Sequence, residues 1–151
     1  MEITKKTINI KDFDLSLDNE DGLSVSITGY HGKDSHVNIP GYLQDLKIKK
    51  IDFEAFKGNK KIKRITIEKG ITKIDIGAFE NCMELTEVEL PDGLLEIGLH
   101  AFNGCKKLAK IKFPESILHI YVEAFHNCEK LKTFLSRKMY RKRIILKAVI
   151  N

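Results

Sequence analysis

The fold is decided by the stretch Leu85-Thr-Glu-Val-Glu-Leu-Pro-Asp-Gly-Leu-Leu-Glu-Ile-Gly-Leu-His-Ala-Phe-Asn-Gly-Cys105, because its pattern returns at a fixed interval along the chain. The dipeptide Ala-Phe occurs at four evenly spaced places, and the cysteines keep the same interval. Recurrence in phase with a period of about 20 to 29 residues predicts a solenoid of stacked coils. The repeated positions are Ala55-Phe56, Ala78-Phe79, Ala101-Phe102 and Ala124-Phe125, with Cys82, Cys105 and Cys128.

Each 23-residue coil carries local signals for its strands and turns. Val88-Glu-Leu90 alternates apolar and charged residues, which is typical of a half-buried strand, and the proline that follows ends strand pairing. A second short extended piece leads to Ile97, and Ala-Phe then begins a tight helical turn. Only Gly or Asn occupies the place that ends this turn, which predicts positive φ there. These residues are Gly58, Asn81, Gly104 and Asn127.

Stacked coils bury one another's apolar faces, so equivalent side chains should form ladders, above all a ladder of phenylalanines. The ends of such a stack are open strand edges that need caps. At the N-terminal end, Phe13–Leu17 and Leu23–Ile27 alternate around a turn, which predicts a β-hairpin. Val37-Asn-Ile39 then begins an incomplete first coil.

The 151 residues fit one domain. We expect an N-terminal hairpin cap over 11–30, repeats over 37–135, and a basic cap or degenerate repeat over 136–151. The net charge of +5 is concentrated at the C-terminal end, because residues 129–151 hold eight basic side chains and one acidic side chain. The chain as written begins without the apolar region of a signal peptide, which favours a cytoplasmic location. Trimming of upstream residues would leave the cell surface or secretion open.

These residues resemble the BspA-like, or treponemal-type, leucine-rich-repeat family. The stretch 85–105 is close to the repeat consensus of that family, and 26–40 resembles the segment that introduces its first repeat. The resemblance implies a right-handed leucine-rich-repeat solenoid with a parallel sheet. It also implies protein binding, often adhesion at the surface of bacteria or of some parasitic protists.

No catalytic, metal-binding or cofactor-binding site is expected. The sequence contains no HExxH, GxSxG or phosphate-loop pattern, and no CxxC pair that would suggest zinc. The repeated cysteines have the spacing of ladder neighbours, but small buried loop residues explain that spacing better than a redox or metal role. We therefore expect a protein that is not an enzyme.

Two sets of repeated residues are candidates for binding a protein partner. The first strand of each coil carries charge ladders that alternate in sign, so they could neutralise one another or form a recognition face. The place two residues before each Ala-Phe is apolar in every coil, and this row could be an exposed stripe or part of the core. The charge ladders are Arg64–Glu87–Lys110 and Thr66–Glu89–Lys112, and the apolar row is Phe53, Ile76, Leu99 and Val122.

The basic C-terminal end gives an alternative partner, a nucleic acid or nucleoprotein. Cations there flank an aromatic ring, which suits phosphate contacts with base stacking, although a soluble, self-repelling cap explains the same residues. The candidates are Arg137, Lys138, Tyr140, Arg141, Lys142 and Arg143. The sequence thus favours a protein-interaction module, either a small intracellular binder or inhibitor or a cell-surface adhesion fragment, over a nucleic-acid-binding protein.

Overall fold

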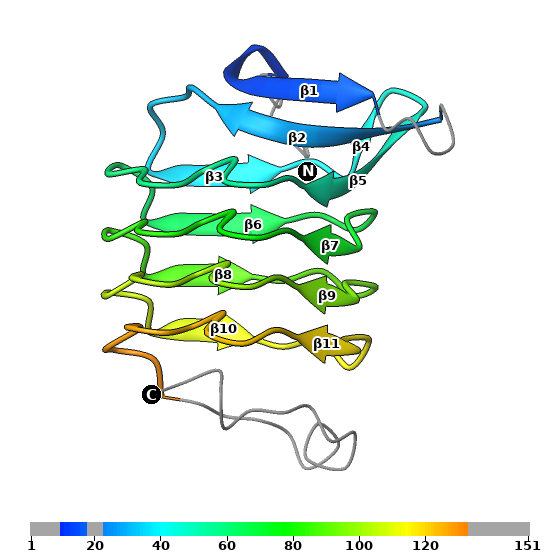
Figure 1. Cartoon of the computed structure of the whole chain (residues 1–151). Helices are drawn as coiled ribbons and strands as arrows, with labels where there is room; N and C mark the ends of the chain where they lie inside the picture. Colours follow the sequence, from blue (N-terminus) through cyan, green and yellow to red (C-terminus); the bar gives the residue numbers. More distant parts are fainter. Residues whose placement is uncertain (1–9, 18–22, 133–151) are drawn as a thin grey trace, which may run out of the picture.

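A computed structural model describes residues 10–17 and 23–132, which form a two-sided solenoid with one sheet on each side (Figure 1). The larger sheet has seven strands in the order β1-β2-β5-β7-β9-β11, with β4 paired to β5, and the smaller has four in the order β10-β8-β6-β3. The strands of the larger sheet are β1 (Phe13–Leu17), β2 (Ser24–Tyr30), β4 (Tyr42–Leu43), β5 (Leu46–Ile51), β7 (Lys73–Ile74), β9 (Glu96–Ile97) and β11 (His119–Ile120). Those of the smaller sheet are β3 (His36–Ile39), β6 (Arg64–Ile67), β8 (Glu87–Glu89) and β10 (Lys110–Lys112), and a single 3-10 turn, η1 (Ile10–Asp12), precedes β1.

The register of the parallel strands follows the sequence period. In the smaller sheet Ile65 pairs with Val88, and Val88 pairs with Ile111. In the larger sheet Ile51 pairs with Ile74, and Ile74 with Ile97. The two members of each pair are one sequence period apart, so one repeat makes one turn of the solenoid and the predicted parallel β-solenoid is confirmed.

The Ala-Phe segment folds as successive turns, and the part of the chain that the structure describes contains no α-helix. In the first complete coil the N–H of Lys57 donates to the carbonyl of Glu54, and the N–H of Asn59 donates to the carbonyl of Phe56. The predicted positive φ at the end of the turn is confirmed. The φ angles are 69° at Gly58, 57° at Asn81, 74° at Gly104 and 58° at Asn127.

The core is the predicted set of ladders, in which each phenylalanine stacks on the one in the next coil. The ring centroids of Phe56 and Phe79 are 4.9 Å apart, and those of Phe79 and Phe102, and of Phe102 and Phe125, are 5.1 Å apart. All four rings are buried. Because equivalent side chains cover one another, no coil has to bury its apolar face alone.

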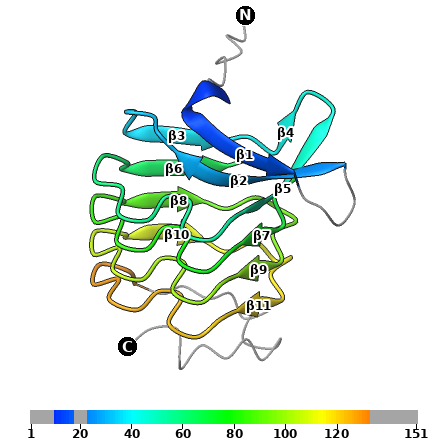
Figure 2. The ribbon, with the colours of Figure 1, turned by 45° about the horizontal axis from the view of Figure 1, so that its top comes forward.

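The hairpin β1–β2 caps the N-terminal end of the solenoid (Figure 2). Strand β2 pairs in parallel with β5, so the hairpin continues the larger sheet. The ring of Tyr30 stacks on Phe56 at 5.3 Å, and Phe13 packs against Tyr30 at 5.1 Å. The aromatic ladder therefore ends inside the cap, and its first phenylalanine is shielded from water.

Candidate functional site

The apolar row of the sequence lies on the surface. We call Phe53, Ile76, Leu99 and Val122 the apolar stripe; the exposed fractions of these residues are 58%, 43%, 37% and 51%. Each follows by two residues a buried isoleucine at the end of β5, β7, β9 or β11, so the stripe runs across all four coils beside the larger sheet (Figure 1). Four apolar side chains aligned on a surface are typical of an interaction site.

Backbone geometry holds the stripe outward. The residue after each member has positive φ, with 52° at Glu54, 62° at Gly77, 55° at His100 and 57° at Glu123. Each member is therefore the first central residue of a turn, which is closed in the first coil by the N–H of Ala55 donating to the carbonyl of Asp52 at 3.2 Å. The alternation of the preceding strand does not extend into this turn.

Hydrogen bonds between coils fix the same segment. The carbonyl of Ile76 accepts from the N–H of Glu54 at 3.1 Å, and the carbonyl of Leu99 accepts from the N–H of Gly77 at 3.0 Å. In addition, Asp75 Oδ1 accepts from the N–H of Ile76 at 2.8 Å. These bonds make the stripe a fixed part of the solenoid, so little conformational entropy is lost when a partner binds it.

Charged side chains border the stripe on both sides, and carboxylates outnumber ammonium groups. Lys50 lies 3.4 Å from a carboxylate oxygen of Asp52 and 3.9 Å from one of Asp75, and Lys57 lies 3.0 Å from Glu80. Each lysine thus faces two acids. The bordering acids are Asp52, Glu54, Asp75, Glu80, Glu96 and Glu123, the bordering lysines are Lys50, Lys57 and Lys73, and His100 is the partner of Glu123.

Three further apolar residues of the last coils are exposed, and they were not among the predicted candidates. Leu95 and Leu118 are 38% and 53% exposed, and Tyr121, next to Val122, is 49% exposed. The signal was available, because Leu95 and Leu118 occupy the same repeat position in neighbouring coils.

The charge ladders lie on the smaller sheet, in the predicted rows. Arg64 Nε is 3.0 Å from a carboxylate oxygen of Glu87, which is in register with Lys110 on the next strand. The hydroxyl of Thr66 donates to Glu89 at 3.3 Å, and Glu89 is in register with Lys112. Opposite charges on neighbouring strands thus offset one another, as in the neutralising interpretation of these rows.

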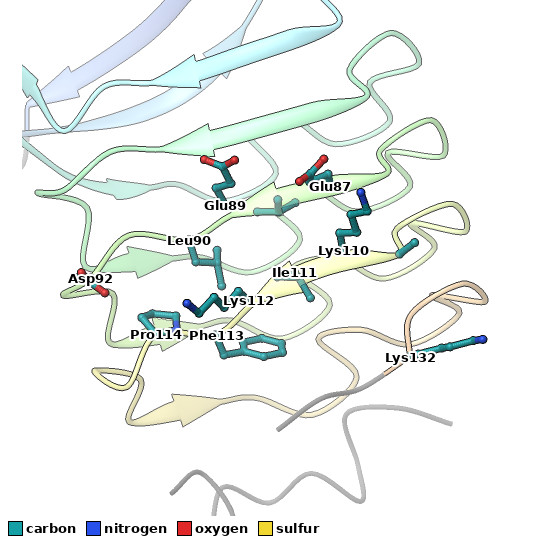
Figure 3. Close-up of a pocket in the computed structure, with 12 residues that line it drawn as sticks. Glu87, Glu89, Leu90, Asp92, Lys110, Ile111, Lys112, Phe113, Pro114 and Lys132 are labelled. Carbon is teal, nitrogen blue, oxygen red and sulfur yellow. The ribbon is translucent and has the colours of Figure 1, made fainter. Parts of the chain in front are cut away.

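A hollow of about 490 Å³ lies along β8 and β10 (Figure 3). The described residues that line it combine an apolar floor of Leu90, Ile111 and Phe113 with charged groups such as Glu89 and Lys112. It is a second candidate surface for binding, and its mixed charges select no particular ligand class.

The cysteines are structural. Their Sγ–H groups donate to phenylalanine carbonyls of the preceding coil, at 3.1 Å from Cys82 to Phe56 and 3.2 Å from Cys105 to Phe79. Burial raises the pKa of Cys82 and of Cys128 to about 12, and burial with the two neighbouring thiols also raises the pKa of Cys105. A protonated, buried thiol is a poor nucleophile and a poor metal ligand.

Two further observations concern only the described part of the chain. Over residues 10–17 and 23–132, no three His, Cys, Asp or Glu side chains are placed to hold a metal ion. The same residues contain no helix long and apolar enough to cross a membrane. The nucleic-acid candidates, which are residues 137, 138 and 140–143, lie outside the described residues.

Solved structures of bacterial proteins share this architecture. A leucine-rich-repeat protein of Treponema pallidum is 36% identical, with a TM-score of 0.77, and the match covers 80% of this chain and 56% of that one. A leucine-rich cell surface protein of Faecalibacterium prausnitzii is 28% identical, with a TM-score of 0.73, over 80% of this chain and 34% of that one. The fold of a Bacteroides capillosus leucine-rich-repeat protein also matches, with a TM-score of 0.72 and 22% identity over 81% of this chain and 91% of that one.

The chain spans only about half or a third of the length of the first two of these proteins. No curated protein matches it. The family model for the BspA type leucine-rich-repeat region matches residues 36–142 with six copies of the repeat. Together with the 23-residue coils and parallel sheets, this match shows that the chain belongs to the BspA-type leucine-rich-repeat family.

Proposed function

We propose that this chain is a non-enzymatic binding module that captures a protein partner on the apolar stripe. The family points to an interaction or adhesion-type module and is generally non-enzymatic. The observation that carries the proposal is the exposure of four equivalent apolar residues, Phe53, Ile76, Leu99 and Val122, on one rigid face. Exposed apolar side chains are costly to keep in contact with water, and covering them supplies binding free energy.

The stripe is favoured over the charge ladders of the smaller sheet as the main contact. Residues at the centre of protein interfaces are depleted in charge and enriched in large apolar and aromatic groups. Phe53, which is 58% exposed, and Tyr121, which is 49% exposed, supply such groups at opposite ends of the stripe. Arg64 and Glu87 pair one to one, so they leave less net charge for a partner than the acids beside the stripe, which outnumber their lysines.

The setting that this family supports best is adhesion. One of the matched proteins is described as a cell surface protein, and rigid repeat surfaces bind large partners with little ordering cost. We therefore expect the partner to be a protein found at a bacterial surface. The alternative is that the chain is an intracellular binder or inhibitor, and the experiment below tests both.

The test compares partner capture by the full chain with capture by two variants. Ile76→Asp with Leu99→Asp places two charges on the stripe, and Met83→Asp places one on an exposed corner away from it. Proteins from the native cell surface and from the cytosol are cross-linked to each form and quantified by mass spectrometry.

We expect at least one protein to be captured by the natural chain and by the Met83 variant but to be lost from the double variant. Unfolding midpoints of all three forms establish that the loss is not caused by unfolding. If the same proteins are captured by all three forms, or none is captured at all, the stripe is not the binding surface.

A further inference from the structure

The spacing of the apolar stripe restricts the shape of what can lie on it. Neighbouring coils are about 5 Å apart, as the stacked rings of Phe79 and Phe102 show, so four stripe residues span about 15 Å. An α-helix presents apolar residues at i, i+4, i+7 and i+11 over about 16 Å, because it rises about 1.5 Å per residue. An extended strand needs about 20 Å for four side chains on one face. Of these two conformations, the helix matches the spacing of all four coils.

Charge restricts the composition of that helix. The ion pairs beside the stripe join six carboxylates to three lysines and His100, so carboxylates outnumber lysines in these pairs by three even though the whole chain carries +5. Asp75, on one side of the stripe, pairs with Lys50 and Lys73, and Glu80, on the other side, pairs with Lys57. Each of these lysines also pairs with a second carboxylate. A partner with basic side chains beside its apolar row would complement this border, and an acidic partner would be repelled.

We propose, on the basis of the function proposed above, that the partner presents a basic amphipathic α-helix. It lies along the apolar stripe, across the coils and parallel to the solenoid axis. Its apolar row packs between Phe53, Ile76, Leu99 and Val122, and its lysines or arginines face Asp52 and Asp75 on one side and Glu54, Glu80 and Glu123 on the other.

The probe is a fluorescein-labelled 18-residue peptide with Leu at i, i+4, i+7 and i+11 and Lys and Ala elsewhere, stapled on its polar face to hold the helix. One control peptide has Glu in place of every Lys. A second has the composition of the probe, but its leucines are placed at every other position, which favours a strand. Fluorescence anisotropy with the full chain measures the three affinities at low and at physiological salt.

We expect the basic helical peptide to bind at least tenfold more tightly than either control, and its affinity to fall as salt rises. Ile76→Ser with Leu99→Ser should weaken it at least tenfold, and the milder pair Ile76→Ala with Leu99→Ala should weaken it less. Met83→Ser, which changes an exposed apolar residue away from the stripe, should alter it by less than twofold.

Equal binding of the alternating or acidic peptide, or no effect of the stripe variants, would overturn the inference. So would sedimentation showing that the free chain dimerises through the stripe, because a second copy would then be the occupant. If stripe-dependent capture of a cellular protein succeeds while the helical peptide neither binds nor competes, the proposed function stands and only the helix is refuted.

Discussion

The phenylalanine ladder makes a quantitative prediction about how stability is coupled along the solenoid. The rings of Phe79 and Phe102 are fully buried and nearly parallel, with an interplanar angle of 11°. Replacement of Phe102 by Leu keeps an apolar side chain in the core but removes its stacking on Phe79 and on Phe125. Phe56 and Phe102 are separated by Phe79, so they share no direct contact of this kind.

The expected size follows from these neighbours. An aromatic pair contributes about 0.5–1.5 kcal/mol beyond its burial, so Phe102→Leu should lower the free energy of unfolding by about 1–3 kcal/mol. Phe102→Ala also leaves a cavity and should cost about 3–5 kcal/mol. In a double-mutant cycle, Phe79→Leu and Phe102→Leu should couple by about 0.5–1.5 kcal/mol, because their direct contact is lost only once. Phe56→Leu and Phe102→Leu should add within about 0.5 kcal/mol.

The assay is urea unfolding of the single and double variants, followed by far-ultraviolet circular dichroism because the chain has no tryptophan. Equal m-values across the set are required before the free energies are compared. The nearest-neighbour reasoning is refuted if the pair at positions 56 and 102 couples as strongly as the pair at 79 and 102. It is also refuted if Phe102→Leu is neutral.

Four further tests address other parts of the structure. Because the folded pKa of Cys82 is about 12, against an ordinary value of 9.0, the free energy of unfolding should fall as pH rises from 9 to 12, and urea titrations should show a shallower fall for Cys82→Ala. Gly58→Asn should be nearly neutral in thermal unfolding because its φ of 69° suits asparagine and its surroundings are open, whereas Gly58→Ala should cost about 1–2 kcal/mol. Gly98→Ala should also lower the midpoint, because the new Cβ would lie 2.8 Å from the backbone of Asp75. A double-mutant cycle on Arg64 and Glu87 should give less than about 1 kcal/mol, and high salt should abolish it.

The periodicity of the sequence was sufficient to predict the coils, the ladders and the conformation of the turns. The constant period places Phe56 over Phe79 in any stacked arrangement, and burial then requires contact between them. The alternation of Gly and Asn at positions 58 and 81 identified positive φ directly, because few other residues tolerate it. These features depend on local chemistry repeated in phase, which a sequence displays.

The orientation of the stripe could not be predicted in the same way. Ile51 points into the core, and simple alternation would turn Phe53 inward again. Strand β5 ends at Ile51, however, and Phe53 lies in the turn closed by Asp52 and Ala55, in which Glu54 has positive φ, so the alternation of the strand does not apply to Phe53. Glutamate rarely adopts positive φ, so the residue type at this position gives no sign of the turn in the sequence. The excess of carboxylates beside the stripe could not be predicted from the sequence either, because these side chains come together from different coils.

The same stacking that forms the core also keeps the stripe straight. The first coil has five extra residues before Ile48, and these would displace Phe53 from the row if they shifted the register of β5 with β7. They form instead the turn in which Tyr42 of β4 pairs antiparallel with Lys47 of β5, and this hairpin projects from the corner (Figure 1). Lys50 and Ile51 therefore keep their register with Lys73 and Ile74. Length variation is absorbed at a corner, so that corner can change without disturbing a surface whose spacing is set by the phenylalanine ladder beneath it.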